Sequence, residues 1–288
     1  MENNYFDSSF LNILKKLKIM TSSRFKGSQT GGRKTFETGS SIEFSDYRVY
    51  SPGDDLRFVD WNLFARLDEM FIKVFHNEEN TNVFIFLDIS RSMRFGDPLK
   101  IEFAKKVAAA IAYIALAQRD TVQLICYSDK IMKISKPFFR PGEIMDIFAL
   151  LNEVSCAGED HLDEVLKKFF MRVKKKGVAF IISDFWNLPA LDNGLKNLKY
   201  YKFDANLFHI VDNSEIVFNN YGDWDLIDSE TKETLKIDID EKIANIFRSK
   251  IQSHFHSIEK ICSKFSFFYQ RTLTSAPFEY MIMQYFAK

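Results

Sequence analysis

The chain has 288 residues, of which 46% are hydrophobic and 27% are charged, a balance typical of a folded globular protein and not of a disordered one. Lysine plus arginine and aspartate plus glutamate each number 39, so no net positive charge points to a general nucleic-acid binder. The three cysteines show no Cys-x-x-Cys spacing. This argues against a disulfide framework or a cysteine zinc site and favours a reducing compartment.

The N-terminal residues lack the charged and then apolar segments of a signal peptide. The apolar run from Val107 to Ala117 is much shorter than the ~20 residues that cross a bilayer. We therefore expect a soluble, cytoplasmic protein.

Residues 1–80 read differently from the rest, and we assign them to an N-terminal extension that packs on the following domain. Phe10, Leu11, Leu14 and Leu17 recur at helical spacing and predict a short amphipathic helix. A basic loop rich in Gly, Ser and Thr follows the helix, and a Pro-Gly-Asp-Asp turn comes after the loop.

Residues 8–36 contain basic side chains but no acidic one. Such a stretch could dock on anionic membranes or nucleic acid, and that binding would weaken steeply with salt. A solvated lysine face on a packed helix explains the same charges, and we prefer it. The basic residues of the stretch are Lys15, Lys16, Lys18, Arg24, Lys26, Arg33 and Lys34.

Further along, we expect Arg57 and Asp60 to pair beside Trp61 as a structural corner.

Residues 81–288 alternate between strand and helix patterns. The apolar run Val83–Leu87 is typical of a strand buried on both faces of a parallel sheet. Asp97 followed by Pro98 predicts the cap of the next helix. The alternation predicts an α/β fold with a Rossmann-like, doubly wound and mainly parallel sheet. Further strands are expected at 121–127, 131–134, 178–182, 207–211 and 266–270, further helices at 142–152, 161–174, 188–199 and 243–258, and a hairpin at 223–238.

Three of the expected strands end in an aspartate, at Asp88, Asp184 and Asp212. In an open parallel sheet, ligands bind beyond the carboxyl ends of the strands, where the strand order reverses. Asp88 opens an Asp-x-Ser-x-Ser sequence with Ser90 and Ser92, which places one carboxylate and two hydroxyls on one loop. Such oxygen ligands suit Mg²⁺. The alternative is that the serines cap the next helix and Asp88 closes a turn.

The segment DISRSM after an apolar strand resembles the metal-ion-dependent adhesion site of von Willebrand factor A domains. The upstream block, from Ile42-Glu43-Phe44 through Tyr50–Arg57 to Asp60-Trp61, resembles one bacterial family, called domain of unknown function 58. The segments ISDF at 182–185 and HIVDNSE at 209–215 also fit, so the resemblance covers nearly the whole chain.

The resemblance implies a von Willebrand factor A-like fold for residues 81–288 and a partnership with MoxR-type AAA+ ATPases, beside which this family is often encoded. The protein would be a non-catalytic adaptor that binds an acidic side chain of its partner through Mg²⁺, Mn²⁺ or Ca²⁺. Carried over by position, Asp88, Ser90 and Ser92 match the first metal loop and Asp184 matches the later aspartate.

One metal ligand departs from the family pattern. Such domains usually place a threonine shortly before a helix, and alignment on Leu162 puts Asp160 at that position. We assign Asp160 to the metal site as a further carboxylate, where it would weaken the pull of the metal on an acidic partner; the alternative is that the departure leaves the site weakened or empty. Arg91, between the two serines, is expected to supply an added basic contact to that partner.

An Asp-based, metal-dependent phosphohydrolase is the enzymatic alternative, because a strand ending in a nucleophilic aspartate also opens haloacid-dehalogenase-type phosphatases. In those enzymes an acid/base aspartate follows two residues later, whereas this chain has Ser90. The segment 27–35 nearly spells a phosphate-binding loop, but no buried strand precedes it. We therefore expect no catalysis.

Overall fold

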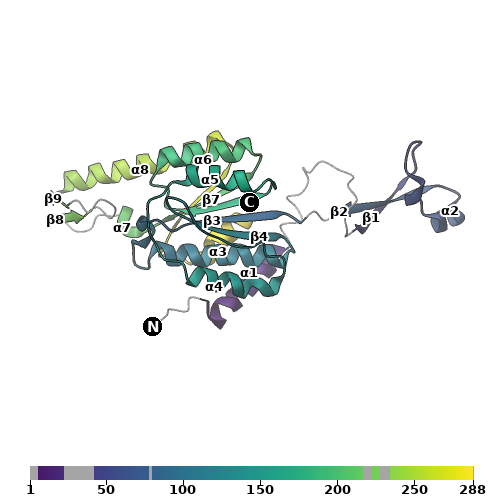
Figure 1. Ribbon diagram of the computed structural model, residues 1–288, viewed down its shortest axis with the longest axis horizontal. Coiled ribbons are helices and arrows are strands. Elements are labelled where there is room, and N and C mark those ends of the chain that lie inside the picture. The colour runs from purple at the N-terminus through teal and green to yellow at the C-terminus, as the bar shows by residue number, and fades with distance from the viewer. Residues whose placement is uncertain (1–5, 23–41, 78–79, 217–221, 228–233, 288) are drawn as a thin grey trace. The chain divides into compact units, whose positions relative to one another are not determined.

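The computed structural model (Figure 1) describes residues 6–22, 42–77, 80–216, 222–227 and 234–287. It divides into two compact units. The larger comprises Met1–Gln29 and Thr81–Lys288, and the smaller comprises Thr30–Asn80. The division differs from a single boundary at residue 80, because the N-terminal helix belongs to the larger unit.

The larger unit is built on a six-stranded sheet with the order β10-β7-β6-β3-β4-β5. β5 runs antiparallel to β4, and every other neighbouring pair is parallel. When the six strands of this sheet are renumbered from one to six in chain order, their spatial order from the β5 edge is 3-2-1-4-5-6. This is the strand order of doubly wound folds. The predicted α/β class with a mainly parallel sheet is therefore confirmed. The strands are β3 (Asn82–Asp88), β4 (Thr121–Tyr127), β5 (Ile131–Ile134), β6 (Val178–Ser183), β7 (Asp204–Val211) and β10 (Phe268–Leu273).

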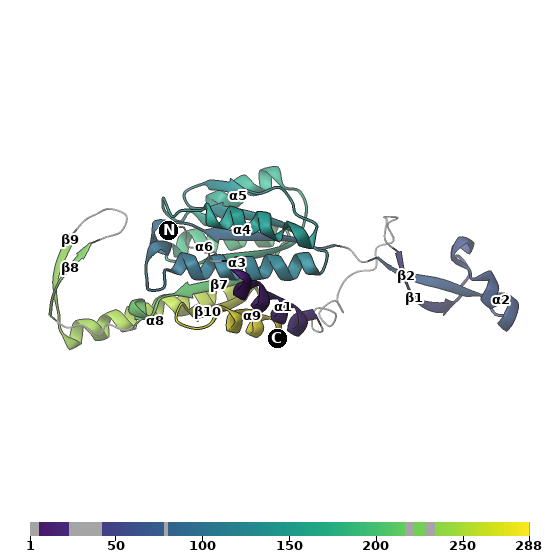
Figure 2. The same cartoon turned by 90° about the horizontal axis from the view of Figure 1, so that it is seen from below.

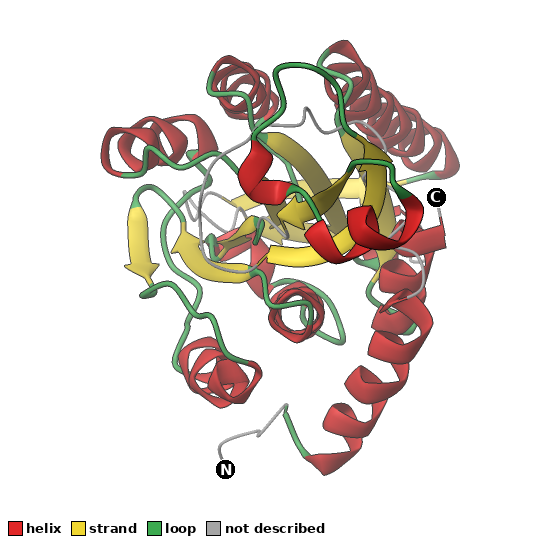
Figure 3. Ribbon diagram, turned by 90° about the vertical axis from the view of Figure 1, so that its right-hand side faces the viewer, coloured by secondary structure: helices red, strands yellow, loops and turns green. Residues whose placement is uncertain are grey.

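Helices flank the sheet on both faces, as Figure 3 shows in cross-section. One buried cluster joins the sheet to α1, α3, α4 and α9, and a second joins it to α5, α6 and α8. The central strand β3 contributes to both clusters, which is why its sequence is apolar without alternation. The helices are α1 (Ser8–Ser22), α3 (Lys100–Ala117), α4 (Ile144–Asn152), α5 (Leu162–Arg172), α6 (Leu188–Tyr200), α8 (Glu241–Lys264) and α9 (Phe278–Ala287).

The predicted N-terminal helix is present as α1, which contacts α3 and α9 (Figure 2). Phe10, Leu14 and Leu17 are buried in the core, while Lys15 and its basic neighbours are exposed. The lysine face of α1 is thus solvated, as the preferred interpretation requires. The other basic residues of the stretch (Arg24, Lys26, Arg33 and Lys34) and the segment 27–35 lie outside the described residues.

One local expectation is wrong. α3 begins at Lys100 with Leu99 in the N-cap position, so Asp97 is not its cap. The turn before the helix is instead closed by the backbone, because the Lys100 amide donates to the Phe95 carbonyl (2.9 Å). In addition, α9 has no counterpart among the expected elements.

In the smaller unit, β1 (Ile42–Val49) and β2 (Phe71–Asn77) form an antiparallel pair, with the turn η2 (Leu56–Phe58) and the helix α2 (Trp61–Leu67) between them. The expected Arg57–Asp60 pair is wrong. Arg57 pairs with Asp55 (2.6 Å), its neighbour at the start of η2. Asp60 caps α2 and pairs with Lys73 (3.0 Å).

The remaining elements are short. The predicted hairpin is present as β8 (Gly222–Ile227) and β9 (Thr234–Ile239). Within the described residues, no helix has the length and apolar character needed to span a membrane. Single turns are η3 (Arg91–Arg94), η4 (Pro141–Glu143) and α7 (Asn213–Ile216).

Candidate functional site

Three loops meet at the carboxyl edge of the sheet, where the strand order reverses between β3 and β6. Asp88 ends β3, Asp184 directly follows β6, and Asp160 lies two residues before α5. All three carboxylates are buried. Asp88 and Asp184 are placed by the strands that they end, whereas Asp160 depends on its loop.

Backbone hydrogen bonds hold the Asp160 loop against the loop after β3. The Ala157 amide donates to the Ile89 carbonyl (2.8 Å), and the Arg91 amide donates to the Gly158 carbonyl (3.0 Å). On the other side, the side-chain amide of Asn187 donates to the Asp160 carbonyl (2.9 Å). The loop is thus tied to both strand ends, which brings the predicted site residues into one cluster.

Asp88 is fully buried and both of its carboxylate oxygens accept hydrogen bonds. Oδ1 accepts from the Ser90 amide (2.8 Å), and Oδ2 accepts from the Ser183 hydroxyl (2.6 Å). Ser90 occupies the N-cap position of η3 but its side chain makes no capping bond. Its hydroxyl lies 3.0 Å from that of Ser92. The alternative interpretation is therefore wrong in giving Ser90 a capping role, but Asp88 does close a turn as that interpretation expects, since it accepts from the amide two residues later.

Asp184 is held by a lysine that the sequence analysis did not select. Its Oδ2 accepts from Lys100 Nζ (2.7 Å), and the same ammonium contacts Glu215 Oε1 (2.6 Å). Asp184 Oδ1 is buried without a hydrogen-bond partner. The sequence contained one indication of this role. Lys100 lies four residues before Ala104 and so falls on the apolar, core-facing stripe of α3, where a lysine needs a buried partner.

Charge repulsion is strong in this cluster. Burial, and next the Asp184 charge, raise the pKa of Asp88 to about 7. Burial, and next the Asp88 charge, raise the pKa of Asp160 well above its ordinary value. For Lys100, burial works to lower the pKa, but the ion pairs with Asp184 and Glu215 outweigh it and the pKa is raised. Burial and like charge thus favour the protonated, neutral form of Asp88 and Asp160, while Asp184 is paired with the buried ammonium of Lys100.

The donor chemistry fits a hard divalent cation. The cluster offers carboxylate and hydroxyl oxygens, and one of them, Asp184 Oδ1, is buried without a hydrogen-bond partner among the described residues. As placed, however, the described residues contain no group of three or more His, Cys, Asp or Glu side chains in position to hold a metal. Asp184 is bonded to an ammonium instead. The ligands fit a metal by type, and a rearrangement is needed to assemble them.

The chain matches one family over most of its length. The model of the family described as "Protein of unknown function DUF58" covers residues 46–257. The chain belongs to the DUF58 family. The matched range includes the carboxylate cluster and most of the described part of the smaller unit.

Relatives of this DUF58 protein occur in mycobacteria. Proteins of Mycobacterium bovis and Mycobacterium tuberculosis, both described as uncharacterized, are 21% identical to it over 255 residues. Each alignment covers 86% of this chain and 80% of the relative.

Two solved structures resemble the DUF58 chain at low sequence identity. The conserved hypothetical protein BatB of Bacteroides thetaiotaomicron is 14% identical, with a TM-score of 0.41, over 72% of this chain and 98% of its own. An aerotolerance-related membrane protein of Bacteroides fragilis is 16% identical, with a TM-score of 0.40, over 72% and 99%. These scores are too low to carry an argument about fold or function.

The structure also describes two further residues that the sequence analysis of this DUF58 protein selected, Arg91 and Asp212. Arg91 is an exposed residue at the start of η3, on the loop that follows β3. Asp212, the third strand-end aspartate, accepts hydrogen bonds from Ser214 and from Thr274 Oγ1 (2.8 Å). These bonds give Asp212 a structural role in closing the loop after β7.

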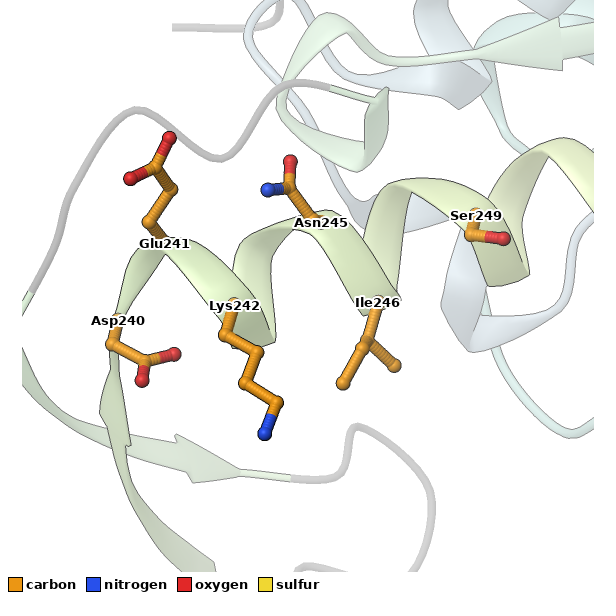
Figure 4. Close-up of a pocket in the computed structure, with 6 residues that line it drawn as sticks. All are labelled: Asp240, Glu241, Lys242, Asn245, Ile246 and Ser249. Carbon is orange, nitrogen blue, oxygen red and sulfur yellow. The ribbon is translucent and has the colours of Figure 1, made fainter.

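A surface hollow lies along the first turns of α8, and Figure 4 shows the side chains around it. A single helix and its cap form this hollow, and none of the clustered carboxylates lines it. It therefore offers no converging polar groups, and the strand-end cluster remains the candidate site. The lining residues are Asp240, Glu241, Lys242, Asn245, Ile246 and Ser249.

Proposed function

We propose that this protein is a non-catalytic, metal-dependent adaptor that binds an acidic side chain of a protein partner. The α/β unit would be a von Willebrand factor A-like domain with a metal-ion-dependent adhesion site. The metal would be Mg²⁺, or else Mn²⁺ or Ca²⁺. Its ligands would be Asp88, Ser90, Ser92 and Asp184, with Asp160 as a further carboxylate.

The observation that carries this proposal is the convergence of carboxylates and hydroxyls at the switch point of the sheet. Asp88 and Asp184 follow adjacent parallel strands, and hydrogen bonds tie the Asp160 loop to both strand ends. A hard cation prefers such oxygens. Because hydroxyl ligands are neutral, a cation held partly by Ser90 and Ser92 keeps positive charge for an incoming carboxylate.

The hydrogen bonds of Asp88 support a binding role over a catalytic one. Both of its oxygens accept bonds within the site, and the residue two positions later is Ser90. A phosphohydrolase of the haloacid-dehalogenase type needs an acid/base carboxyl at that position to protonate the leaving group. A serine hydroxyl is too weak an acid for this task.

For the partner, we propose a MoxR-type AAA+ ATPase in the cytoplasm, on the strength of the family resemblance. We propose that Arg91, an exposed residue between Ser90 and Ser92, adds a basic contact to the carboxylate that reaches the metal.

The test is an interferometry titration of the ATPase encoded nearest in the genome, in Mg²⁺ and again with chelator. Wild-type protein should bind only in Mg²⁺, and Asp88→Ala should abolish binding with the fold intact. Asp129→Asn is the matched control, since Asp129 lies just after β4 at the same edge and is about half exposed. Binding that ignores both chelator and Asp88→Ala would refute the proposal.

A further inference from the structure

Lys100 is an unusual residue for its place in the fold. It begins α3, and only 1% of its side chain is exposed. A buried ammonium is costly unless carboxylates surround it. Here two carboxylates do so, Asp184 at 2.7 Å and Glu215 at 2.6 Å.

The two carboxylates come from different loops. Asp184 follows β6, while Glu215 lies on α7 after β7. Glu215 Oε2 also accepts from the Asp212 amide (2.8 Å), which fixes the glutamate in its own loop. Lys100 thus bridges two adjacent strand ends, and it would keep one partner if it lost the other.

The cluster still has an unsatisfied polar atom beside this ion pair. Asp184 Oδ1 has no hydrogen-bond partner, although Oδ2 of the same carboxylate is bonded to Lys100. Tyr127, which pairs in register with Asp88 across β3 and β4, is buried at the same place. The free oxygen of Asp184 indicates that this carboxylate can accept a polar ligand besides Lys100.

We propose that Lys100 is a built-in cation that competes with the divalent metal for Asp184. This inference rests on the proposed metal site and adds its regulation. Without metal, the ammonium neutralises Asp184. A divalent cation on Asp184 repels the ammonium, so Lys100 gives up Asp184 and keeps Glu215. No bond is made or broken covalently, and the charge on Lys100 does not change.

Two consequences follow from this competition. Lys100 weakens the affinity for metal, so the site fills only above a threshold concentration. Metal binding also alters the contact between α3 and the Asp184 loop, and Lys100 then depends on Glu215 alone. The state of the metal site is thereby communicated to α7 and to the loop after β7.

The test is a calorimetric Mg²⁺ titration of three full-length proteins. Lys100→Met should bind Mg²⁺ about tenfold more tightly than wild type or better, because the competing charge is gone. Lys105→Met is the matched control. Lys105 is also a buried lysine of α3, but its Nζ donates to the Val154 carbonyl (2.8 Å). Its loss should leave the affinity unchanged within about twofold.

A double variant separates competition from a general field effect and guards against misfolding. Lys100→Met with Glu215→Gln removes one positive and one negative charge, so the local net charge stays the same and fewer buried charges are left unpaired. Competition predicts that this variant also binds Mg²⁺ more tightly than wild type. A field effect predicts no gain, and that result would overturn the proposal.

The wild-type protein provides a readout that needs no variant. The NMR signal of the Lys100 side-chain ammonium should shift on addition of Mg²⁺, and that of Lys105 should not. If Mg²⁺ binds wild type and Lys100→Met equally, the inference fails and the metal site stands. If only Lys100→Met binds Mg²⁺, the inference holds and the metal-dependent function of the wild type fails. If neither binds, both fail.

Discussion

Among the single residues, Asp88 is the carboxyl whose ionisation the fold opposes. It is fully buried beside Asp184, and its pKa is raised to about 7. In the unfolded chain an aspartate has a pKa near 3.9. Between these two values the folded protein binds the proton more tightly than the unfolded chain does. The contribution of Asp88 to the free energy of unfolding therefore falls as pH rises from about 4 to 7, and it is constant above that range.

This linkage predicts the pH dependence of metal binding. Mg²⁺ needs the ionised carboxylate, so the stabilisation by Mg²⁺ should be small at pH 5.5 and should grow up to pH 8. Thermal unfolding with and without Mg²⁺ across this range is the measurement. In Asp88→Asn, which does not ionise, the growth should disappear. An Mg²⁺ shift of equal size at pH 5.5 and pH 8 would contradict the role of Asp88.

Asp160 permits a second prediction at the same scale. If Asp160 ionises as a ligand of the proposed metal, its negative charge should reduce the pull of the metal on an acidic partner. We expect Asp160→Thr to strengthen partner binding in Mg²⁺ by about tenfold, roughly one well-placed charge interaction. An interferometry titration checks this. Weaker binding by a folded Asp160→Thr variant would show that Asp160 is itself a required ligand.

At the scale of the element, α1 forms part of the core of the α/β unit although 30–80 separates it from the rest in sequence. Its buried face contacts α3 and α9, and Phe10 lies 5.3 Å from Phe278 between ring centroids. The helix therefore stabilises the unit by apolar burial, and its lysines remain in solvent.

The packing of α1 predicts a stability effect. Leu14 has no exposed surface, so Leu14→Ala should lower the free energy of unfolding by about 3 kcal/mol. Ile19 lies on the same helix with 74% of its surface exposed, and Ile19→Ala should cost less than about 0.5 kcal/mol. Urea unfolding of both variants measures the difference. Equal effects would mean that α1 does not dock as described.

At the scale of the whole molecule, the unit Thr30–Asn80 is an insertion between α1 and β3. Replacing it with a flexible linker of about ten residues should leave the cooperative unfolding of the α/β unit and its Mg²⁺ response intact. Calorimetry and partner titration test this variant. If Mg²⁺ still binds but the partner does not, the partner docks on the inserted unit. Loss of cooperative unfolding would show that the α/β unit requires it.

The whole protein should also be free of phosphatase activity. Because Ser90 replaces the acid/base carboxyl, we expect no turnover of p-nitrophenyl phosphate above background in Mg²⁺. The matched comparison is Asp88→Asn in the same assay. If the wild type hydrolyses this substrate and Asp88→Asn does not, the protein is a phosphohydrolase and the proposed adaptor role is wrong.

The sequence by itself determined the strands of the central sheet, most of the helices and two of the clustered carboxylates, whereas β1 and β2 were not expected and Asp160 was placed only through the family resemblance. Apolar runs mark buried parallel strands, and an aspartate at the end of a run necessarily lies at the carboxyl edge of the sheet. Asp88 and Asp184 could be found for this reason, as could the oxygens of Ser90 and Ser92, which share a loop with Asp88. These features depend on residues that are neighbours in the chain.

Only the tertiary structure decided the environment of those carboxylates. Asp160 ends no strand and reaches the cluster through hydrogen bonds to two other loops. Lys100 pairs with Glu215, 115 positions away, across the ends of two strands. The separation of Thr30–Asn80 from α1 also depends on which surfaces pack. Such contacts are set by strand order and loop register, and no local pattern in the sequence encodes them.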